Sequence, residues 1–413
     1  MNNERILAQG ISVSNDTKST GLNNNDLIIG SSGSGKTGGY VIPNLQNISG
    51  SMVVSDTKGQ LCKMFSKELK AKGYRVYTID MVNPLKSCGY NPLKGIRKYS
   101  DGKYREQDVL TLANTIMPML DGHDPFWEQA ATGYIAFLIA FCMDFLPPEE
   151  QNMMSVLELH DKYITNSSAF EFQRLIKYNV NTFSARKHRQ LKAIANADKM
   201  WSSILEFANR ALEPFSFAEA KHIFDNPKPF DLTELGRRKT VVFLNVSDTD
   251  RSLDQLVNIF HTQALQVLCS EADAKPDGRL KVPVRLIMDD FAAGARIPDF
   301  DKVISVIRSR EISVSIILQS LSQLNALYSD AEAQTIVNNC DHLLYLGCQE
   351  PKTAEFIGYR LCKTPTSVLN MPRDSVILIT NGEPAKMVKK IVPYSTMEQA
   401  PKKTPPKEAE LSM

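Results

Sequence analysis

Eight residues near the start of the chain have the types and spacing of a phosphate-binding loop. Residues 30–37 read GSSGSGKT and fit the pattern G-x-x-x-x-G-K-[ST], after an apolar run and before a helical pattern. In such a loop, backbone N–H groups and the start of the helix surround phosphate oxygens. We expect Lys36 to reach the β- and γ-phosphates and Thr37 to bind Mg²⁺. The cradle itself would be formed by Gly30, Ser31, Ser32, Gly33, Ser34 and Gly35.

The same stretch contains a second pattern, that of a dinucleotide-binding turn. Residues 33–38 read GSGKTG and fit G-x-G-x-x-G, and Asp56 follows at about the distance of a ribose-binding acid. This alternative leaves Lys36 and Thr37 without a role. We therefore favour the nucleoside triphosphate as the ligand.

Two acids follow an apolar run in the second half of the chain. Residues 284–288 read VRLIM, and Asp289 and Asp290 come directly after them. Hydrolysis of a nucleoside triphosphate needs a carboxylate at a buried strand end to hold Mg²⁺. We expect Asp289 to hold Mg²⁺ through water and Asp290 to orient or deprotonate the attacking water, because adjacent strand residues point in opposite directions. The alternative is a pair of solvated acids.

Polar residues flank the next apolar run, 312–318. Gln319 follows the run, and ligands of open α/β sheets lie beyond the carboxyl ends of the strands. Gln319 is thus expected to position water or sense the γ-phosphate, with capping of the next helix as the alternative. Arg308 and Arg310 precede the run. An arginine that reaches a neighbouring subunit's nucleotide stabilises transition-state charge, but spacing does not separate that role from a solvated side chain.

Three further segments keep two interpretations each. The strand end at 56–59 reads DTKG, which suits either phosphate binding or a helix cap by Asp56 or Thr57. Residues 123–127 read HDPFW, which favours packing over chemistry. A basic stretch forms either a solvated helix face or a nucleic-acid contact; it comprises Arg174, Lys177, Arg186, Lys187, Arg189 and Lys192.

Hydrophobic periodicity indicates how the chain positions these residues. Short strands alternate with helices up to residue 80, helical spacing prevails from about 104 to 235, and the alternation resumes at 240. This order predicts an α/β protein with a mostly parallel central sheet and an inserted all-α domain. We predict nucleotide-binding parts at 1–103 and 236–396, the insertion at 104–235 and a disordered tail at 397–413.

Composition excludes several protein classes. A net charge of +2 over 413 residues gives no bulk affinity for nucleic acid. The 7 cysteines contain no C-x-x-C pair and the 6 histidines are isolated, so we expect free thiols in a reducing cytosol and no metal cluster. No signal peptide is visible, and the longest apolar stretch, 134–146, reads as a buried helix, so we expect a soluble chain.

A series of longer strings resembles the type IV secretion coupling proteins of the TraG/TraD class, most closely those of Gram-positive conjugative elements. The similarity covers roughly residues 5–395, in the family's order. The strings are LIIGSSGSGKTGGYVIPNL, VVSDTKGQL, YNPL, DPFWEQAA, MDDFAAGARIPDF and SREISVSIILQSLSQL.

The resemblance implies a RecA-like P-loop ATPase with an inserted all-α domain, working as a homo-hexamer with ATP and Mg²⁺. Such proteins bring a relaxase–DNA substrate to a type IV secretion channel and use ATP hydrolysis to drive transfer. Carried onto this chain, residues 30–37 are the nucleotide loop, Asp289 and Asp290 the acidic motif, and Gln319 the third motif. Arg308, 19 residues after Asp289, stands at the spacing of the family's arginine finger, which favours it over Arg310. The all-α domain is expected to contact DNA and partners.

The sequence departs from the family in two places. The second acid is usually Glu, whereas this chain has the shorter Asp290, which leaves the hydrolysis rate open. The family's N-terminal membrane anchor is not in this sequence, so either the sequence is a truncated piece or a separate partner supplies the anchor. We expect a cytoplasmic protein that assembles at the inner face of the membrane and is largely monomeric in isolation.

Three functions remain open at this point. The first is an ATP-driven motor that pumps DNA or nucleoprotein into a conjugation channel. The second is an ATP-dependent docking platform for the relaxosome with little hydrolysis of its own. The third is a generic RecA-like translocase that acts on chromosomal DNA.

Overall fold

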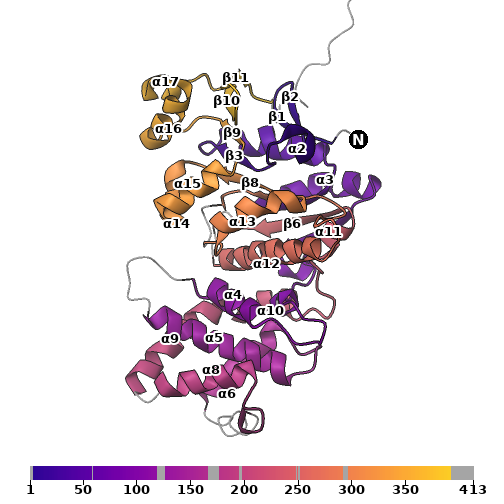
Figure 1. Cartoon of the computed structure of the whole chain (residues 1–413), viewed down its shortest axis with the longest axis vertical. Helices are drawn as coiled ribbons and strands as arrows, with labels where there is room; N and C mark the ends of the chain where they lie inside the picture. The colour runs from indigo at the N-terminus through magenta and orange to yellow at the C-terminus, as the bar shows by residue number, and fades with distance from the viewer. Residues whose placement is uncertain are drawn as a thin grey trace, which may run out of the picture.

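The structure, a computed structural model, describes residues 3–57, 59–118, 126–165, 176–194, 198–247, 249, 252–291 and 296–391. Figure 1 shows an α/β part and a helical part stacked along the long axis of the molecule. The predicted tail at 397–413 lies outside the described residues.

The α/β part is built on a nine-stranded sheet of order β11-β10-β9-β3-β8-β7-β4-β6-β5. Strands β9 to β5 in this order run parallel, and β10 and β11 are antiparallel to their neighbours. The strands are β3 (Asp26–Ile29), β4 (Ser51–Thr57), β5 (Arg75–Asp80), β6 (Thr240–Val246), β7 (Val284–Met288), β8 (Ile312–Leu318), β9 (His342–Tyr345), β10 (Ser375–Thr380) and β11 (Lys386–Lys389).

The strand order excludes the dinucleotide-binding alternative. In that fold the first two strands of the motif are neighbours. Here β8 and β7 separate β3 from β4, which carries Asp56. A ribose-binding acid on β4 would therefore stand three strands from the phosphate loop.

Both faces of the sheet are buried, as expected for a mainly parallel sheet. Along β3, Leu27 and Ile29 belong to one apolar cluster and Ile28 to the other. One face is covered by α2 (Ile42–Gln46) and α3 (Gln60–Ala71). The other packs against α12 (Asp254–Asp273), α13 (Phe300–Val306), α14 (Leu321–Leu327), α15 (Asp330–Asn338) and α16 (Pro351–Leu361).

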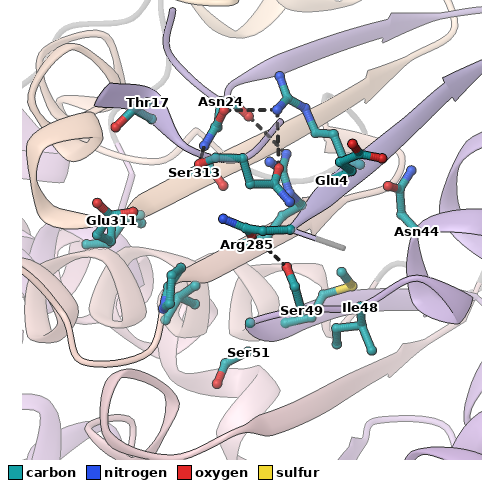
Figure 2. A pocket seen from close by; sticks show the side chains of 18 of the residues that line it. Glu4, Thr17, Asn24, Asn44, Ile48, Ser49, Ser51, Arg285, Glu311 and Ser313 are labelled. Carbon is teal, nitrogen blue, oxygen red and sulfur yellow. Dashed lines mark hydrogen bonds between the residues drawn. The ribbon is translucent and has the colours of Figure 1, made fainter. Parts of the chain in front are cut away.

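An N-terminal hairpin and a short helix border a polar pocket at the amino edge of the sheet. The hairpin is β1 (Glu4–Ala8) paired with β2 (Ile11–Ser14), and α1 (Thr17–Thr20) follows it. Figure 2 shows the pocket, into which Arg285 of β7 projects beside Asn24 and Ser313.

The helical part lies between β5 and β6 in the sequence. Its helices are α4 (Glu106–Ile116), α5 (Phe126–Phe145), α6 (Met153–Ile164), α8 (Phe183–Ile194), α9 (Asp198–Ser216) and α10 (Ala218–Phe224). Helix α5 is the central one, with α4, α6, α8 and α9 packed around it. Among the described residues it is also the one helix long and apolar enough to cross a membrane, with 78% of its most apolar window buried inside the protein. The prediction of a buried helix at 134–146 is confirmed, within a longer element.

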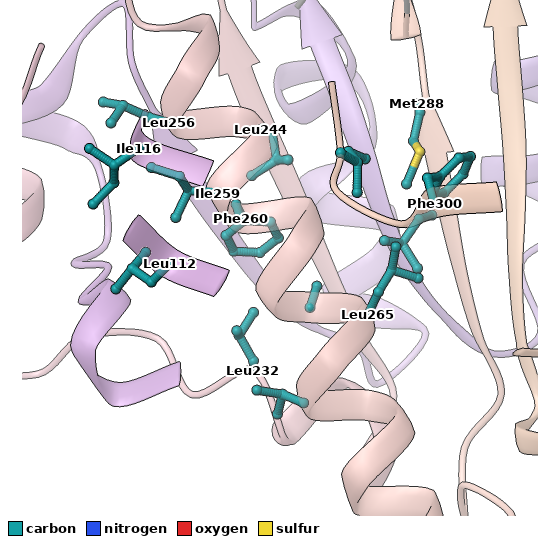
Figure 3. Close-up of a cluster of buried hydrophobic side chains, with 14 of the residues drawn as sticks. Leu112, Ile116, Leu232, Leu244, Leu256, Ile259, Phe260, Leu265, Met288 and Phe300 are labelled. Atoms are coloured by element: carbon teal, nitrogen blue, oxygen red, sulfur yellow. The ribbon is translucent and has the colours of Figure 1, made fainter. Parts of the chain in front are cut away.

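Helix α12 joins the two parts through apolar contacts. Figure 3 shows Ile259 and Phe260 of α12 between Leu112 and Ile116 of α4 and Leu244 of β6. All five side chains are buried. Burial of this apolar surface from water stabilises the stacking of the helical part on the sheet.

Candidate nucleotide-binding site

The phosphate-loop sequence forms a tight connection after β3. Gly33 and Gly35 have φ of +74° and +96°, conformations that side chains rarely adopt. Gly30 is needed for space, because a Cβ there would stand 2.3 Å from Ser34 Oγ and 3.1 Å from Leu346 Cβ. The Gly30 N–H donates to Leu318 O over 3.0 Å, which ties the loop to β8.

The polar groups of the loop are arranged to accept an anion. Lys36 Nζ donates to Gly30 O at 2.7 Å and to Ser31 O at 3.2 Å, two carbonyls of its own loop. The buried Oγ of Ser34 has no hydrogen-bond partner among the described residues. Since such groups are normally satisfied, an ammonium on loop carbonyls and an orphaned hydroxyl fit a ligand with phosphate oxygens.

The helix after the loop begins with a widened turn. Residues Thr37–Val41 form a π-helix, in which the Ile42 N–H donates to Thr37 O, and α2 continues from it. Pro43 follows the π turn directly, and it has no N–H to donate to the preceding turn. Single π turns occur frequently at functional sites.

The acidic pair meets the loop at the carboxyl edge of the sheet. Thr37 Oγ1 donates to Asp289 Oδ2 over 3.3 Å. Asp290 has φ of +50°, and its N–H donates to Asp289 Oδ1 over 3.0 Å. Burial, with the nearby Asp290 charge, raises the pKa of Asp289 to about 6. The Thr37 hydroxyl and the Asp289 carboxylate, whose negative charge is disfavoured here, fit a bound Mg²⁺, which prefers such oxygen ligands.

Gln319 lies at the same edge of the sheet, between the strand that leads to the phosphate loop and the strand that leads to the acidic pair. It follows β8, which pairs with β3 on one side and β7 on the other. Its side chain is exposed, and its N–H donates to Gln323 Oε1 over 2.8 Å. The capping contact at this strand end is therefore made by Gln323, and Gln319 stays the predicted phosphate-facing residue.

Arg308 lies at the opposite edge of the sheet. It belongs to a 3-10 turn, Ile307–Arg310, that precedes β8, so it is separated from the loop of its own chain by the length of that strand, about 23 Å. The exposed Arg308 donates from Nη2 to Thr17 O over 3.2 Å and lines the pocket of Figure 2. Arg310 bonds to Asp273, with Nε 2.8 Å from Oδ1.

A buried ionic cluster joins the amino ends of the central strands, and no local pattern of residues indicated it. Asp26, the first residue of β3, accepts from Arg5 Nε at 2.9 Å and from Arg285 Nη1 at 3.2 Å. Burial would raise the pKa of Asp26, but the two guanidinium groups hold it below its usual value. Tyr40, in the π-helix, also donates to Asp26, and this bond connects the phosphate-loop helix to the cluster.

The strand-end segment 56–59 makes local contacts. Asp56 accepts from the N–H groups of Leu61 at 3.0 Å and Cys62 at 2.8 Å, so it caps α3, as one of the two interpretations predicted. Lys58 lies outside the described residues, as do Arg174 and His123 to Pro125.

Several positively charged side chains of the basic stretch on α8 contact other groups of the protein. Arg186 pairs with Glu106, and Arg189 donates to Val180 O over 2.9 Å. Lys187 Nζ lies 5.5 Å from the ring centre of Phe183, and burial lowers its pKa. These contacts favour a structural helix face over a free nucleic-acid surface.

Comparison with known families agrees with this geometry. The family described as type IV secretory system conjugative DNA transfer matches residues 2–366, which is most of the chain. The chain belongs to this family. The resemblance to coupling proteins deduced from the motifs is thereby confirmed.

Curated relatives support the same assignment. The chain is 22% identical to VirD4 of Agrobacterium fabrum over 344 residues, and 21% identical to VirD4 of Rhizobium rhizogenes over 344 residues. Each match covers 80% of this chain and 48% of the relative. The chain thus spans about half the length of the curated relatives it matches.

Solved structures share the fold. The bacterial conjugative coupling protein TrwBdeltaN70 matches with a TM-score of 0.69 at 16% identity, over 94% of this chain and 88% of that chain. VirB4 of Thermoanaerobacter pseudethanolicus matches more distantly, with a TM-score of 0.51 at 14% identity, over 91% of both chains. The predicted fold, a RecA-like P-loop protein with a helical insertion, is confirmed by these likenesses.

Proposed function

We propose that this coupling-family chain binds and hydrolyses ATP and delivers relaxase-bound DNA to a type IV secretion channel during conjugation. The observation that carries the proposal is the contact between Thr37 and Asp289, which joins the phosphate loop to the acidic strand end. A loop alone binds phosphate, whereas a loop joined to a carboxylate pair has the parts required for hydrolysis. Structures of the related TrwB in complex with ADP and Mg²⁺ and with a non-hydrolysable ATP analogue support the choice of ligand.

Each residue of the site has a proposed role in this reaction. The loop N–H groups and Lys36 bind the β- and γ-phosphates, and Thr37 and Asp289 hold Mg²⁺. The metal supplies positive charge to the phosphate oxygens. Asp290 orients the attacking water and accepts its proton, and Gln319 positions that water from the neighbouring strand.

A complete site on this proposal requires a second copy of the chain. Arg308 stands at the sheet edge opposite to its own phosphate loop, so it is the candidate to reach a neighbour's nucleotide. We therefore propose a homo-hexamer as the active form and low turnover by the isolated chain. We further propose that it works on the cytoplasmic side of the membrane and that the helical part meets DNA and relaxase.

The deciding experiment measures ATP turnover against protein concentration, with and without single- and double-stranded DNA. We expect wild-type turnover per chain to rise with concentration and with DNA, and Lys36→Ala to remain at background throughout. Wild-type turnover equal to that of Lys36→Ala under all these conditions would refute the motor. In that case, retained nucleotide-dependent capture of a relaxase complex would favour the docking platform instead.

A further inference from the structure

A second lysine contacts the phosphate loop from its outer side. Lys390 follows the edge strand β11, and its Nζ donates to Ser34 O at 3.1 Å and to Leu346 O at 2.7 Å. Ser34 belongs to the phosphate loop, and Leu346 follows β9, the strand beside β3. One side chain from the end of the sheet thus connects the loop to its neighbouring strand.

The backbone holds Lys390 in this position. Its N–H donates to Asp374 O over 2.8 Å, next to β10. The backbone carbonyl oxygen of the preceding residue, Lys389, accepts from the Gln9 N–H at 3.2 Å, which ties the same segment to the N-terminal hairpin. The side chain of Lys390 is half-buried, and burial lowers its pKa, whereas that of Lys389 is exposed and pairs with the Asp374 carboxylate. The two adjacent lysines therefore have different surroundings.

The contact with Ser34 acts on the peptide unit that continues into Gly35. A cation bonded to the Ser34 carbonyl polarises this peptide and increases the positive charge on the Gly35 N–H. In a phosphate loop the N–H groups face the ligand while the carbonyls face outward. The ammonium of Lys390 also neutralises two carbonyl dipoles and fixes the loop against β9 before a ligand binds, which lowers the ordering cost of binding.

A pocket beside the loop extends this arrangement. It is lined by loop residues, by residues that follow β9 and by two cationic side chains, Arg373 and Lys390. Neither cation was a candidate from the sequence, and both lie beyond residues 2–366, the part that matches the family.

We propose that Lys390 is a positioning residue of the nucleotide site: it holds and polarises the Ser34–Gly35 peptide and so sets the affinity of the loop for the triphosphate. This proposal rests on the function proposed above. It makes the last strand of the sheet part of the ATP-binding machinery, although Lys390 itself contacts only protein carbonyls.

The test compares Lys390→Met, Lys390→Arg and the matched control Lys389→Met in the full chain. Equilibrium binding of a fluorescent ATP analogue with Mg²⁺ gives Kd, and steady-state ATP turnover gives KM and kcat. We expect Lys390→Met to raise Kd and KM about tenfold and to change kcat less than about threefold, as for loss of a charge-assisted hydrogen bond that acts on binding. Lys390→Arg should recover most of the affinity, and Lys389→Met should match wild type.

Equal Kd values for Lys390→Met and Lys389→Met, with Lys36→Ala still unable to bind, would overturn the role of Lys390 and leave the proposed function intact. Wild-type ATP turnover equal to that of Lys36→Ala would instead refute the proposed function. Should Lys390→Met fail to fold, Lys390→Gln and Lys390→Arg provide the comparison, because both keep a long side chain with N–H donors and differ in charge. Tighter binding by the Arg variant is expected, and equal binding would contradict the proposal.

Discussion

Thr37 and Asp289 lie 252 residues apart in the sequence, and Thr37 Oγ1 donates to Asp289 Oδ2 over 3.3 Å. The threonine ends the phosphate loop, and the aspartate follows β7, two strands away in the sheet. The contact is possible because parallel strands place their carboxyl ends at one edge. The pair therefore defines where a metal-bound phosphate would lie, between the loop and the acidic strand end.

Substitutions of Asp289 and Asp290 are expected to impair ATP turnover in different ways. Asp289→Asn removes a proposed Mg²⁺ ligand, so the Mg²⁺ concentration for half-maximal ATP turnover should rise about tenfold or more. Asp290→Asn removes the proposed proton acceptor, so kcat should fall about 10²-fold with little change in Mg²⁺ dependence. Turnover measured across a Mg²⁺ series checks both variants, each serving as the control for the other. An identical Mg²⁺ dependence in the two variants would contradict these roles.

Two glycines of the loop region should respond very differently to a methyl group. Gly30→Ala places a Cβ 2.3 Å from Ser34 Oγ, so the loop must distort, and we expect ATP affinity to fall at least about tenfold. Gly39→Ala meets nothing closer than 3.8 Å and should bind ATP as wild type does. Calorimetric Kd values for both variants test this contrast. Equal affinities would mean that the loop adapts to a side chain at position 30.

Breaking the buried ionic cluster around Asp26 should lower the free energy of unfolding substantially. Asp26→Asn leaves the buried guanidinium groups of Arg5 and Arg285 without their counter-charge, and we expect the free energy of unfolding to fall by about 3–5 kcal/mol. Glu383→Gln breaks the exposed pair with Lys386 and should cost less than about 1 kcal/mol. Urea unfolding measures both. A loss below about 1 kcal/mol for Asp26→Asn would show that the cluster contributes little to stability.

A buried histidine should make stability depend on pH. Burial lowers the pKa of His261 from 6.5 to about 4. Between these values the unfolded chain takes up a proton that the folded chain does not, so stability falls as the pH decreases, by up to about 3 kcal/mol. Urea unfolding between pH 7 and pH 4.5 should give a shallower pH dependence for His261→Gln than for wild type. His188, whose pKa burial also lowers to about 4, contributes to the slope that remains. Parallel curves for the two proteins would exclude His261 as a source.

The proposed role of Arg308 in a neighbouring site can be tested by mixing. Arg308→Ala should lose turnover by about 10³-fold, whereas Arg310→Ala, which loses the pair with Asp273 and a hydrogen bond to Val306 O, should keep it. Lys36→Ala carries an intact Arg308, and Arg308→Ala carries an intact loop. A mixture of these two inactive proteins should therefore regain part of the ATP turnover. A mixture as inactive as its components would contradict action between subunits.

Much of the site's position could be predicted because each part follows a local rule. The loop has a fixed spacing, and Asp289, Asp290 and Gln319 come directly after apolar runs that had to be buried strands. The parallel arrangement then places all of them at one edge. The strand order itself was not available from local patterns, since β3 pairs with β8 and β9 from the last third of the chain.

Features that depend on distant partners could not be predicted. Asp26 was not a candidate residue from the sequence, and only the folded sheet brings Arg5 and Arg285 to it. Lys390 was not a candidate either, because its partners Ser34 and Leu346 are distant in the sequence. Helical spacing over 104–235 did not indicate where one helix ends and the next begins, and the structure has separate helices α8 and α9 there.

The pairing of β3 with β8 and β9 has a consequence for biosynthesis. Translation produces β3 about 280 residues before the first residue of β8, which at about 5–20 residues per second corresponds to roughly 15–60 s. During that interval the apolar strand Asp26–Ile29 has neither of its neighbours. A nascent chain therefore exposes the phosphate-loop strand to chaperones until the carboxyl-terminal third emerges. For the same reason, an amino-terminal fragment that stops before β8 would contain the complete loop sequence and lack the sheet that shapes it.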